Sequence, residues 1–185
     1  MISSDFNVHH TFTAYLEDKP GALARVSSLF LRRNYNIVSL TVGRSAVPGV
    51  SRLTVVVDAD ADSARLIEAN LYKLVNVLRV EDVTYAPTVE HELILIKVRA
   101  GQRTHDLAQL CETVGARIVD DSPDAFIIEA TGSHKENEQL ISQLGPYGLM
   151  EIVCTGVAAM KRGGSVLEEQ PQFVKAQVPS LNGVR

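Results

Sequence analysis

The sequence contains no tryptophan, only two cysteines, and no apolar run approaching the ~18 residues of a membrane-spanning helix. Cys111 and Cys154 are far apart and both lie in apolar patterns, so we expect buried, free thiols. The net charge is −4, whereas a nucleic-acid-binding protein normally carries a basic surface. The first ten residues lack the basic and apolar regions of a signal peptide. These absences predict a soluble, cytoplasmic protein that binds neither membranes nor nucleic acid.

Motifs that carry catalysis or hold metals are missing as well. None of the five histidines lies in an H-x-x-x-H or H-E-x-x-H spacing, and no phosphate-binding or nucleophile-elbow motif occurs. Asp58, Asp60 and Asp62 are spaced like the first ligands of a calcium loop. That loop needs glycine and glutamate where this chain has Ser63 and Ala69. We therefore expect no catalytic residues and no metal site.

The first half of the chain alternates strand patterns with helix patterns. Helical spacing predicts one helix from about Ala22 to Arg33 and a second around Leu66 to Leu74, capped by Asp62 or Ser63. Predicted strands cover residues 10–16, 37–42, 51–58 and 78–85. This order is βαββαβ, a ferredoxin-like arrangement of the α+β class. The middle strands, NIVSLTV and SRLTVVV, lack the aromatic residues that RNA-binding domains of this topology use.

The same order of elements is repeated after Pro87. Strand patterns cover residues 91–98, 116–119, 125–131 and 152–160, and helical patterns follow Thr104 and Ser133. Ser133 and Glu136 have the spacing of a capping box. We therefore predict two tandem ferredoxin-like domains, over residues 10–86 and 87–162. An N-terminal extension over residues 1–9 and a flexible tail over 163–185 flank them. We expect His9 and His10, at the boundary between the extension and the first domain, to be solvated.

The small size of each half has a consequence for assembly. A unit of roughly 75 residues buries only a small core, and a four-stranded open sheet leaves its edges to be covered. Pairing of sheets side by side between chains covers such edges. We therefore expect a homodimer with a two-fold axis, or a higher oligomer.

The turn Asp18-Lys19-Pro20-Gly21 joins the first predicted strand to the first helix. Such a turn leaves backbone N–H groups exposed at the positive end of the helix dipole, where a carboxylate can bind. Asp18 could hold an ammonium group, so the loop is suited to a free amino acid. The alternative is an ordinary connection in which Asp18 only helps to cap the helix.

Two residues after the helix are candidates to complete such a site. Asn36 and Ile37 begin the second strand, from which they can return toward the loop or meet its copy across a dimer interface. Asn36 offers both a donor and an acceptor. Ile37 and Leu23 could line a pocket for a small aliphatic side chain.

The segment LEDKPGALARVSSLFLRRNYNIVSLTVG resembles the amino-acid-binding ACT domain. With PGVSRLTVVV and LYKLVNVLRVEDV after it, the chain resembles the regulatory (small) subunits of acetolactate synthase, also called acetohydroxyacid synthase. HELILIKV and GARIVDD resemble the C-terminal domain of that family, and the resemblance covers about residues 10 to 162. The chain departs from the family at Asp18, where many members carry asparagine.

The resemblance implies a non-catalytic subunit that activates the catalytic large subunit and confers feedback inhibition by valine or another branched-chain amino acid. The large subunit uses thiamine diphosphate, magnesium and FAD, so no cofactor is expected in this chain. The alternative is a stand-alone amino-acid-sensing ACT protein that regulates another enzyme. In the family the effector lies between two ACT domains, which implies contacts from Asp18, Gly21, Ala22 and Leu23 of one protomer and from Asn36 and Ile37 of the other.

Overall fold

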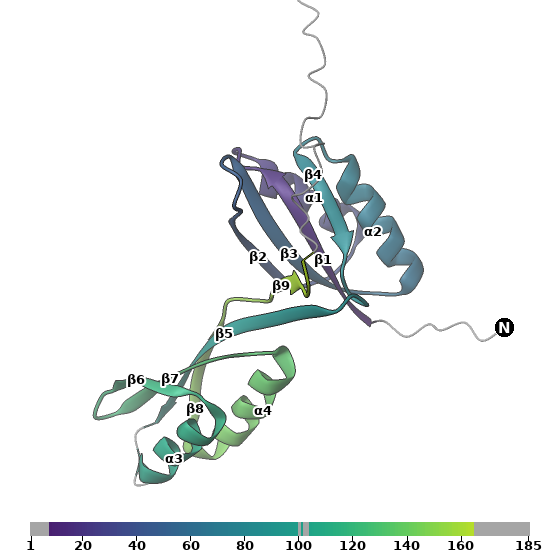
Figure 1. The fold of residues 1–185 in the computed structure, drawn as a ribbon. Helices are drawn as coiled ribbons and strands as arrows, with labels where there is room; N and C mark the ends of the chain where they lie inside the picture. Colours follow the sequence, from purple (N-terminus) through teal and green to yellow (C-terminus); the bar gives the residue numbers. More distant parts are fainter. Residues whose placement is uncertain (1–7, 100, 102–103, 165–185) are drawn as a thin grey trace, which may run out of the picture.

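A computed structural model describes residues 8–99, 101 and 104–164 (Figure 1). The chain has the expected α+β architecture, with two four-stranded antiparallel sheets, each built in βαββαβ order. Most of the predicted N-terminal extension (residues 1–7) and nearly all of the predicted tail (from residue 165) lie outside the described residues. None of the described helices is both long and apolar enough to cross a membrane.

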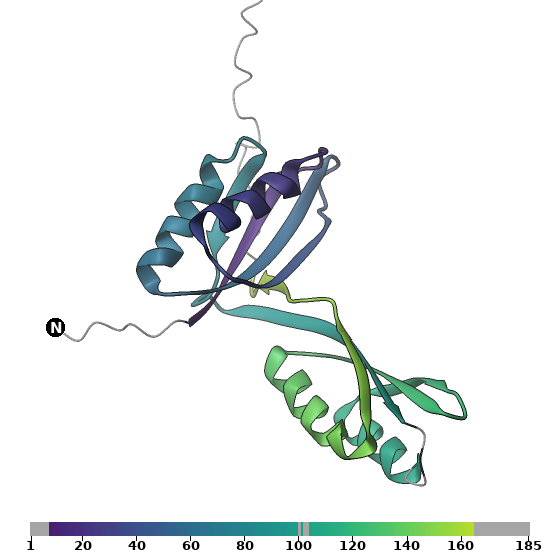
Figure 2. The ribbon, with the colours of Figure 1, turned by 180° about the vertical axis from the view of Figure 1, so that it is seen from behind.

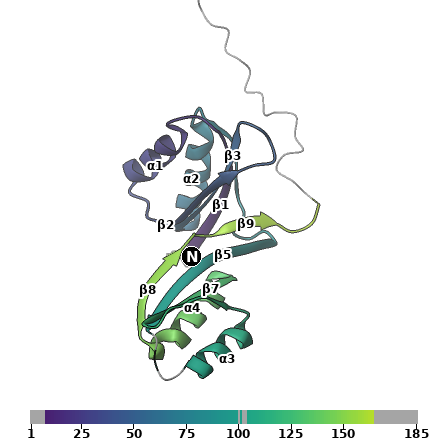
Figure 3. The same cartoon turned by 90° about the vertical axis from the view of Figure 1, so that its left-hand side faces the viewer.

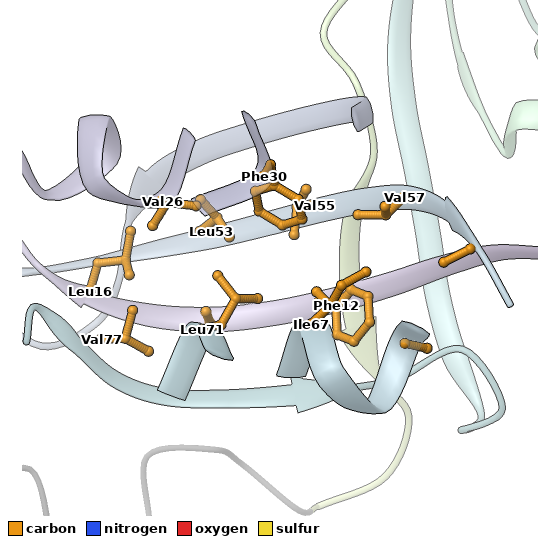
Figure 4. Packing of buried hydrophobic residues seen from close by; sticks show 13 residues of the cluster. Phe12, Leu16, Val26, Phe30, Leu53, Val55, Val57, Ile67, Leu71 and Val77 are labelled. Atoms are coloured by element: carbon orange, nitrogen blue, oxygen red, sulfur yellow. The ribbon is translucent and has the colours of Figure 1, made fainter. Parts of the chain in front are cut away.

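The first unit contains β1 (Val8–Glu17), α1 (Ala22–Arg33), β2 (Ile37–Arg44), β3 (Val50–Ala59), α2 (Ala61–Lys73) and β4 (Val77–Asp82). Its strands lie in the order β2-β3-β1-β4, and both helices cover one face of the sheet (Figure 2). Between helices and sheet lies an apolar core to which Phe12, Phe30, Leu53 and Ile67 contribute (Figure 4). The helix α2 is capped by Asp60, whose Oδ1 accepts from Ser63 N at 2.7 Å, and not by Asp62 or Ser63 as predicted.

The second unit contains β5 (Thr88–Arg99), α3 (Thr104–Val114), β6 (Arg117–Asp121), β7 (Ala125–Gly132), α4 (His134–Leu144), a 3-10 turn (Gly145–Tyr147), β8 (Leu149–Cys154) and β9 (Ala158–Lys161). Its strand order, β6-β7-β5-β8, repeats that of the first sheet. The predicted capping box at the start of α4 is confirmed: Ser133 and Glu136 each bond the backbone N–H of the other.

The prediction of one final strand over residues 152–160 is wrong. The strand stops at Cys154, and the chain turns at Gly156, whose φ is 79°. The short β9 then continues along the same strand, β5, from Thr88 to His91, with its register shifted by one residue relative to β8. A left-handed backbone conformation is accessible to glycine at little cost, which allows the change of direction at this position.

The β5–β9 ribbon covers part of the face of the first sheet that the helices leave open (Figures 1 and 3). Val157 and Ala159 pack there against Val56 and Val83 in a small apolar cluster. Arg52 Nη2 donates to the Ala159 carbonyl at 2.6 Å. Through these contacts the second unit is attached to the first by more than the peptide link between β4 and β5.

Two expectations about single residues are wrong. His10 lies within β1 and is 2 % exposed, with Nδ1 3.0 Å from Asp82 Oδ2. Cys111 is buried as expected, but Cys154 is exposed. Cys154 lies on β8, an edge strand whose six residues are all exposed, so its apolar sequence pattern does not correspond to burial.

We predict that Val157→Asp detaches the ribbon from the first sheet. Val157 is 8 % exposed, and an unpaired carboxylate at such a position costs at least about 2 kcal/mol. Thermal unfolding followed by calorimetry should then show two separate transitions or a lower first transition. The matched control is Met160→Asp on β9, because Met160 is 63 % exposed. Unfolding of Val157→Asp that is identical to that of the control would contradict this packing.

Candidate ligand-binding site

The N-terminus of α1 is open and uncapped. Gly21 occupies the cap position with φ 83° and ψ −7°, and no side chain caps the helix there. Of the first backbone N–H groups, Ala22 N donates to the Lys19 carbonyl at 3.2 Å. The N–H groups of Leu23 and Ala24 have no hydrogen-bond acceptor within the described residues. Two donors therefore remain for an external anion at the positive end of the helix dipole.

The turn before α1 is held by its neighbours rather than by Asp18. Asp18 N donates to the Gly49 carbonyl at 2.8 Å, which ties the turn to the β2–β3 hairpin. On the other side, Asn76 Nδ2 donates to Glu17 Oε2 at 2.8 Å. Asp18 itself is exposed, and its carboxylate does not cap α1. The interpretation of Asp18 as a helix cap is therefore wrong, and its side chain is available to a ligand.

The side chains near the open helix end differ in what they can contact. Ala22 is only 6 % exposed, so it can contribute backbone but little side chain. Leu23 is 41 % exposed and offers an apolar surface beside the free N–H groups. Asn36 is exposed, whereas Ile37 is half-buried and packs partly against the core of the first unit.

Asn36 and Ile37 lie at the opposite end of the first sheet from the turn. In the strand register, Glu17 is opposite Val50, whereas Ile37 is opposite Val57. Seven residues of extended strand separate Val50 from Val57, a distance of about 23 Å. The two groups therefore cannot form one small-molecule site within a single chain. Of the two routes that the sequence left open, a return of Asn36 to its own turn is excluded.

The remaining possibility is that Asn36 meets the turn of a second copy, which requires pairing at the free edge of β2. This strand is the outermost of the first sheet, and its Val38 and Val42 side chains are 43 % and 41 % exposed. If a second copy pairs its β2 antiparallel to this one, each strand start meets the other strand's end. The end of β2, at Arg44, is the end near the turn, because Arg44 and Glu17 lie opposite neighbouring residues of β3. Such pairing brings Asn36 of one copy toward the turn of the other.

The open face of β2 is joined to the second unit. Val157 N donates to Ser39 Oγ at 3.1 Å, and Thr41 Oγ1 donates to the Thr155 carbonyl at 3.2 Å. Space is so limited that a Cβ on Gly156 would lie 2.9 Å from Thr41 Oγ1. Our sequence prediction missed this connection. The one available signal was a glycine inside a predicted strand, which often marks a bend or a close approach.

The described residues contain no group of three or more His, Cys, Asp or Glu side chains that could hold a metal ion. The donors at the turn are backbone N–H groups, and the charged partner is one exposed carboxylate. This arrangement can bind a zwitterion of the size of an amino acid. It lacks an activated nucleophile or a positioned acid–base pair.

We predict that Gly21→Ala destabilises the protein by about 1–2 kcal/mol, because an L-residue resists the left-handed conformation. Nothing in the described structure lies within 4 Å of a Cβ at Gly21, so the cost comes from the backbone alone. Gly21→Asn should cost less, because asparagine tolerates this conformation better. Urea unfolding measures both. A Gly21→Ala variant as stable as the wild-type chain would show that the turn does not need the positive φ.

Comparison with known proteins assigns both units to one family. Residues 12–79 match the family described as AHAS small subunit-like ACT domain, and residues 91–163 match the small subunit of acetolactate synthase. The acetolactate synthase small subunit of Mycolicibacterium smegmatis is 43 % identical over 157 residues, covering 83 % of this chain and 91 % of that protein. A probable acetolactate synthase small subunit of Methanothermobacter thermautotrophicus is 38 % identical over 160 residues, covering 85 % and 95 %.

A solved structure extends the similarity to three dimensions. The crystal structure of the acetolactate synthase small subunit from Thermotoga maritima superposes with a TM-score of 0.78 at 37 % identity, covering 85 % of this chain and 99 % of that one. Sequence and fold thus agree over both units. The chain belongs to the family of acetolactate synthase small subunits, the non-catalytic regulatory subunits of that enzyme, and its first unit is an ACT domain.

Proposed function

We propose that this chain activates the catalytic large subunit of acetolactate synthase and subjects it to feedback inhibition by valine or another branched-chain amino acid in the cytoplasm. The observation that carries the proposal is the uncapped N-terminus of α1, where Leu23 and Ala24 leave two N–H groups without partners beside Asp18. A feedback inhibitor of branched-chain synthesis carries a carboxylate, an ammonium group and an aliphatic side chain. The turn offers a complementary group for each of these three.

The carboxylate of the effector binds the N–H groups of Leu23 and Ala24, where the helix dipole adds ~0.3–2 kcal/mol. The ammonium group is held by Asp18, and the side chain lies on the exposed part of Leu23. An aliphatic pocket distinguishes substrates that differ by one methylene by only ~1–3 kcal/mol. Valine, leucine and isoleucine should therefore all bind, with different affinities.

The site is completed by a second copy of the chain. A two-fold axis through the edge of β2 places Asn36 and Ile37 of each copy near the turn of the other, which gives two equivalent sites per dimer. Asn36 then supplies a second polar contact to the effector, and Ile37 adds apolar surface. The homodimer is in this account a requirement of the site.

The strand β2 transmits the structural change caused by effector binding to the second unit. The strand that carries Asn36 is bonded to the β8–β9 connection through Ser39 and Thr41. A shift of β2 on effector binding therefore moves the second unit, the domain that follows the ACT domain. Coupling between an effector and its target is typically ~1–3 kcal/mol. The large subunit supplies thiamine diphosphate, magnesium and FAD, and this chain supplies the regulation.

We predict that Gly21→Asp abolishes inhibition by valine and leaves activation of the large subunit largely intact. The added carboxylate stands at the cap position, where it repels the effector carboxylate and competes for the free N–H groups. The matched control is Gly115→Asp, because Gly115 has φ 71° and nothing within 4 Å of its Cβ. Gly115→Asp should cost a similar free energy, because it also places an L-residue in a left-handed conformation, but at the end of α3 and away from the site.

The test measures acetolactate formation by the large subunit mixed with each variant, with and without valine, and valine binding by calorimetry. Gly115→Asp should bind valine and inhibit as the wild-type chain does. If Gly21→Asp still bound valine with wild-type affinity, the placement of the site would be wrong. If the wild-type chain did not raise the activity of the large subunit, the proposed function itself would fail.

A further inference from the structure

A cavity of about 460 Å³ lies between the two units. On one side its wall comes from β1, β2 and β3, and on the other side from β5, α4 and the β8–β9 connection. The apolar part of the wall includes Val38, Val56, Ile141 and Val157. None of the residues placed at the effector site lines this cavity. It is therefore a second, separate place where the described chain can receive a small molecule.

The charged side chains around the cavity are acidic. Three of the residues that line it are glutamates: Glu90, Glu92 and Glu138. The lining also contains the exposed His9 and His134, but no lysine or arginine. The negative charge affects a neighbouring group, because burial, and after it the charges of Glu92 and Glu138, raise the pKa of the Cys154 thiol. The cavity therefore favours a positively charged ligand over an anion.

Glu92 is the lining residue that points to a ligand. Its side chain is 8 % exposed, and an ionised carboxylate at such a position is costly unless both oxygens are hydrogen-bonded. Oε1 lies 3.4 Å from Asn137 Nδ2 and 3.2 Å from His134 Nδ1. Oε2 has no hydrogen-bond partner within the described residues. Among these residues, Thr13 Oγ1 is the one fully enclosed side-chain polar atom without a partner. Oε2 is therefore not enclosed by protein and can accept a hydrogen bond from the cavity that Glu92 lines.

The available groups decide which cation fits. The described residues contain no group of three or more His, Cys, Asp or Glu side chains that could hold a metal ion, so hydrogen bonds must hold the cation. An ammonium group donates up to three of them. An amino acid is a poor ligand for this cavity, because its carboxylate would lie among glutamates with no lysine or arginine to bind it. An amine that lacks a carboxylate avoids this repulsion.

We propose that the cavity binds an aliphatic amine, a small molecule with one or more protonated amino groups on an apolar chain. The ammonium group donates to Glu92 Oε2, and the apolar chain packs against Val56 and Val157. Because residues of both units line the cavity, the bound amine stabilises the arrangement in which the two walls face each other. The proposal does not rest on the function proposed for the turn before α1.

Titration of 1,5-diaminopentane into the full-length chain, followed by calorimetry and NMR, tests the site. The amide signals of Gly156 and Val157 should shift in a saturable manner at about 0.15 M salt, where unspecific attraction is screened. The matched ligand is 1,5-pentanediol, which has the same chain without charge and should bind at least about tenfold more weakly. Absence of saturable binding, equal binding of the diol, or shifts confined to the turn before α1 would overturn the proposal.

Three single substitutions locate the bound amine. Glu92→Gln keeps the shape of the side chain but removes its charge, so the Kd for the diamine should rise about tenfold. Glu138→Gln should raise it about threefold, because Glu138 lines the cavity but is exposed. Glu112→Gln is the matched control: it removes an exposed charge on α3 outside the cavity and should leave the Kd unchanged.

Equal affinity of all three variants for the diamine would show that the cavity does not bind it. The exposed position of Glu138 keeps the test decisive even if Glu92→Gln does not fold. Valine binding should be the same in all three variants and in the wild-type chain. A failure of the valine site would therefore be seen separately from a failure of the amine site.

Discussion

The length of α1 determines how this protein can bind a small molecule. The helix has twelve residues and spans about 18 Å, so it carries the chain from the turn at Gly21 to the far end of the first sheet. Asn36 lies there, immediately before β2, at the opposite end of the sheet from its own turn. The free N–H groups and the polar residue suited to complete them are therefore held apart within each chain. In the proposed dimer, a second copy brings them together.

The strand β2 contacts two parts of the described chain besides β3, and in the proposed dimer its free edge meets a third. On the helix side, Leu40 packs against the core of the ACT domain. On the open face, Ser39 and Thr41 are bonded to the β8–β9 connection. The outer edge is free for a second β2. In the proposed dimer, one strand meets the core, the second unit and the partner, so a change at that interface would reach the second unit directly through β2.

Local patterns predicted the elements near the site, and long-range contacts decided the rest. Pro20-Gly21 indicated the uncapped helix start, and the structure has Gly21 there with a positive φ. The burial of His10 depends on Asp82, 72 residues away, which no local pattern reveals. The break at Gly156 was missed because the apolar pattern continues through it, and pairing with β5 resumes after it with the register shifted by one residue. The sequence could not decide whether Asn36 meets its own turn, because that depends on the strand register.

Complementation between two defective chains tests the shared site most directly. Gly21→Asp and Asn36→Ala, each expressed alone, should bind no measurable valine in calorimetry. Co-expressed, they form mixed dimers in which one site has two altered halves and the other has none. With random assortment, about one quarter of the wild-type binding capacity should return, at wild-type affinity. If the mixture bound no more valine than the separate variants, the site would not be shared between two copies.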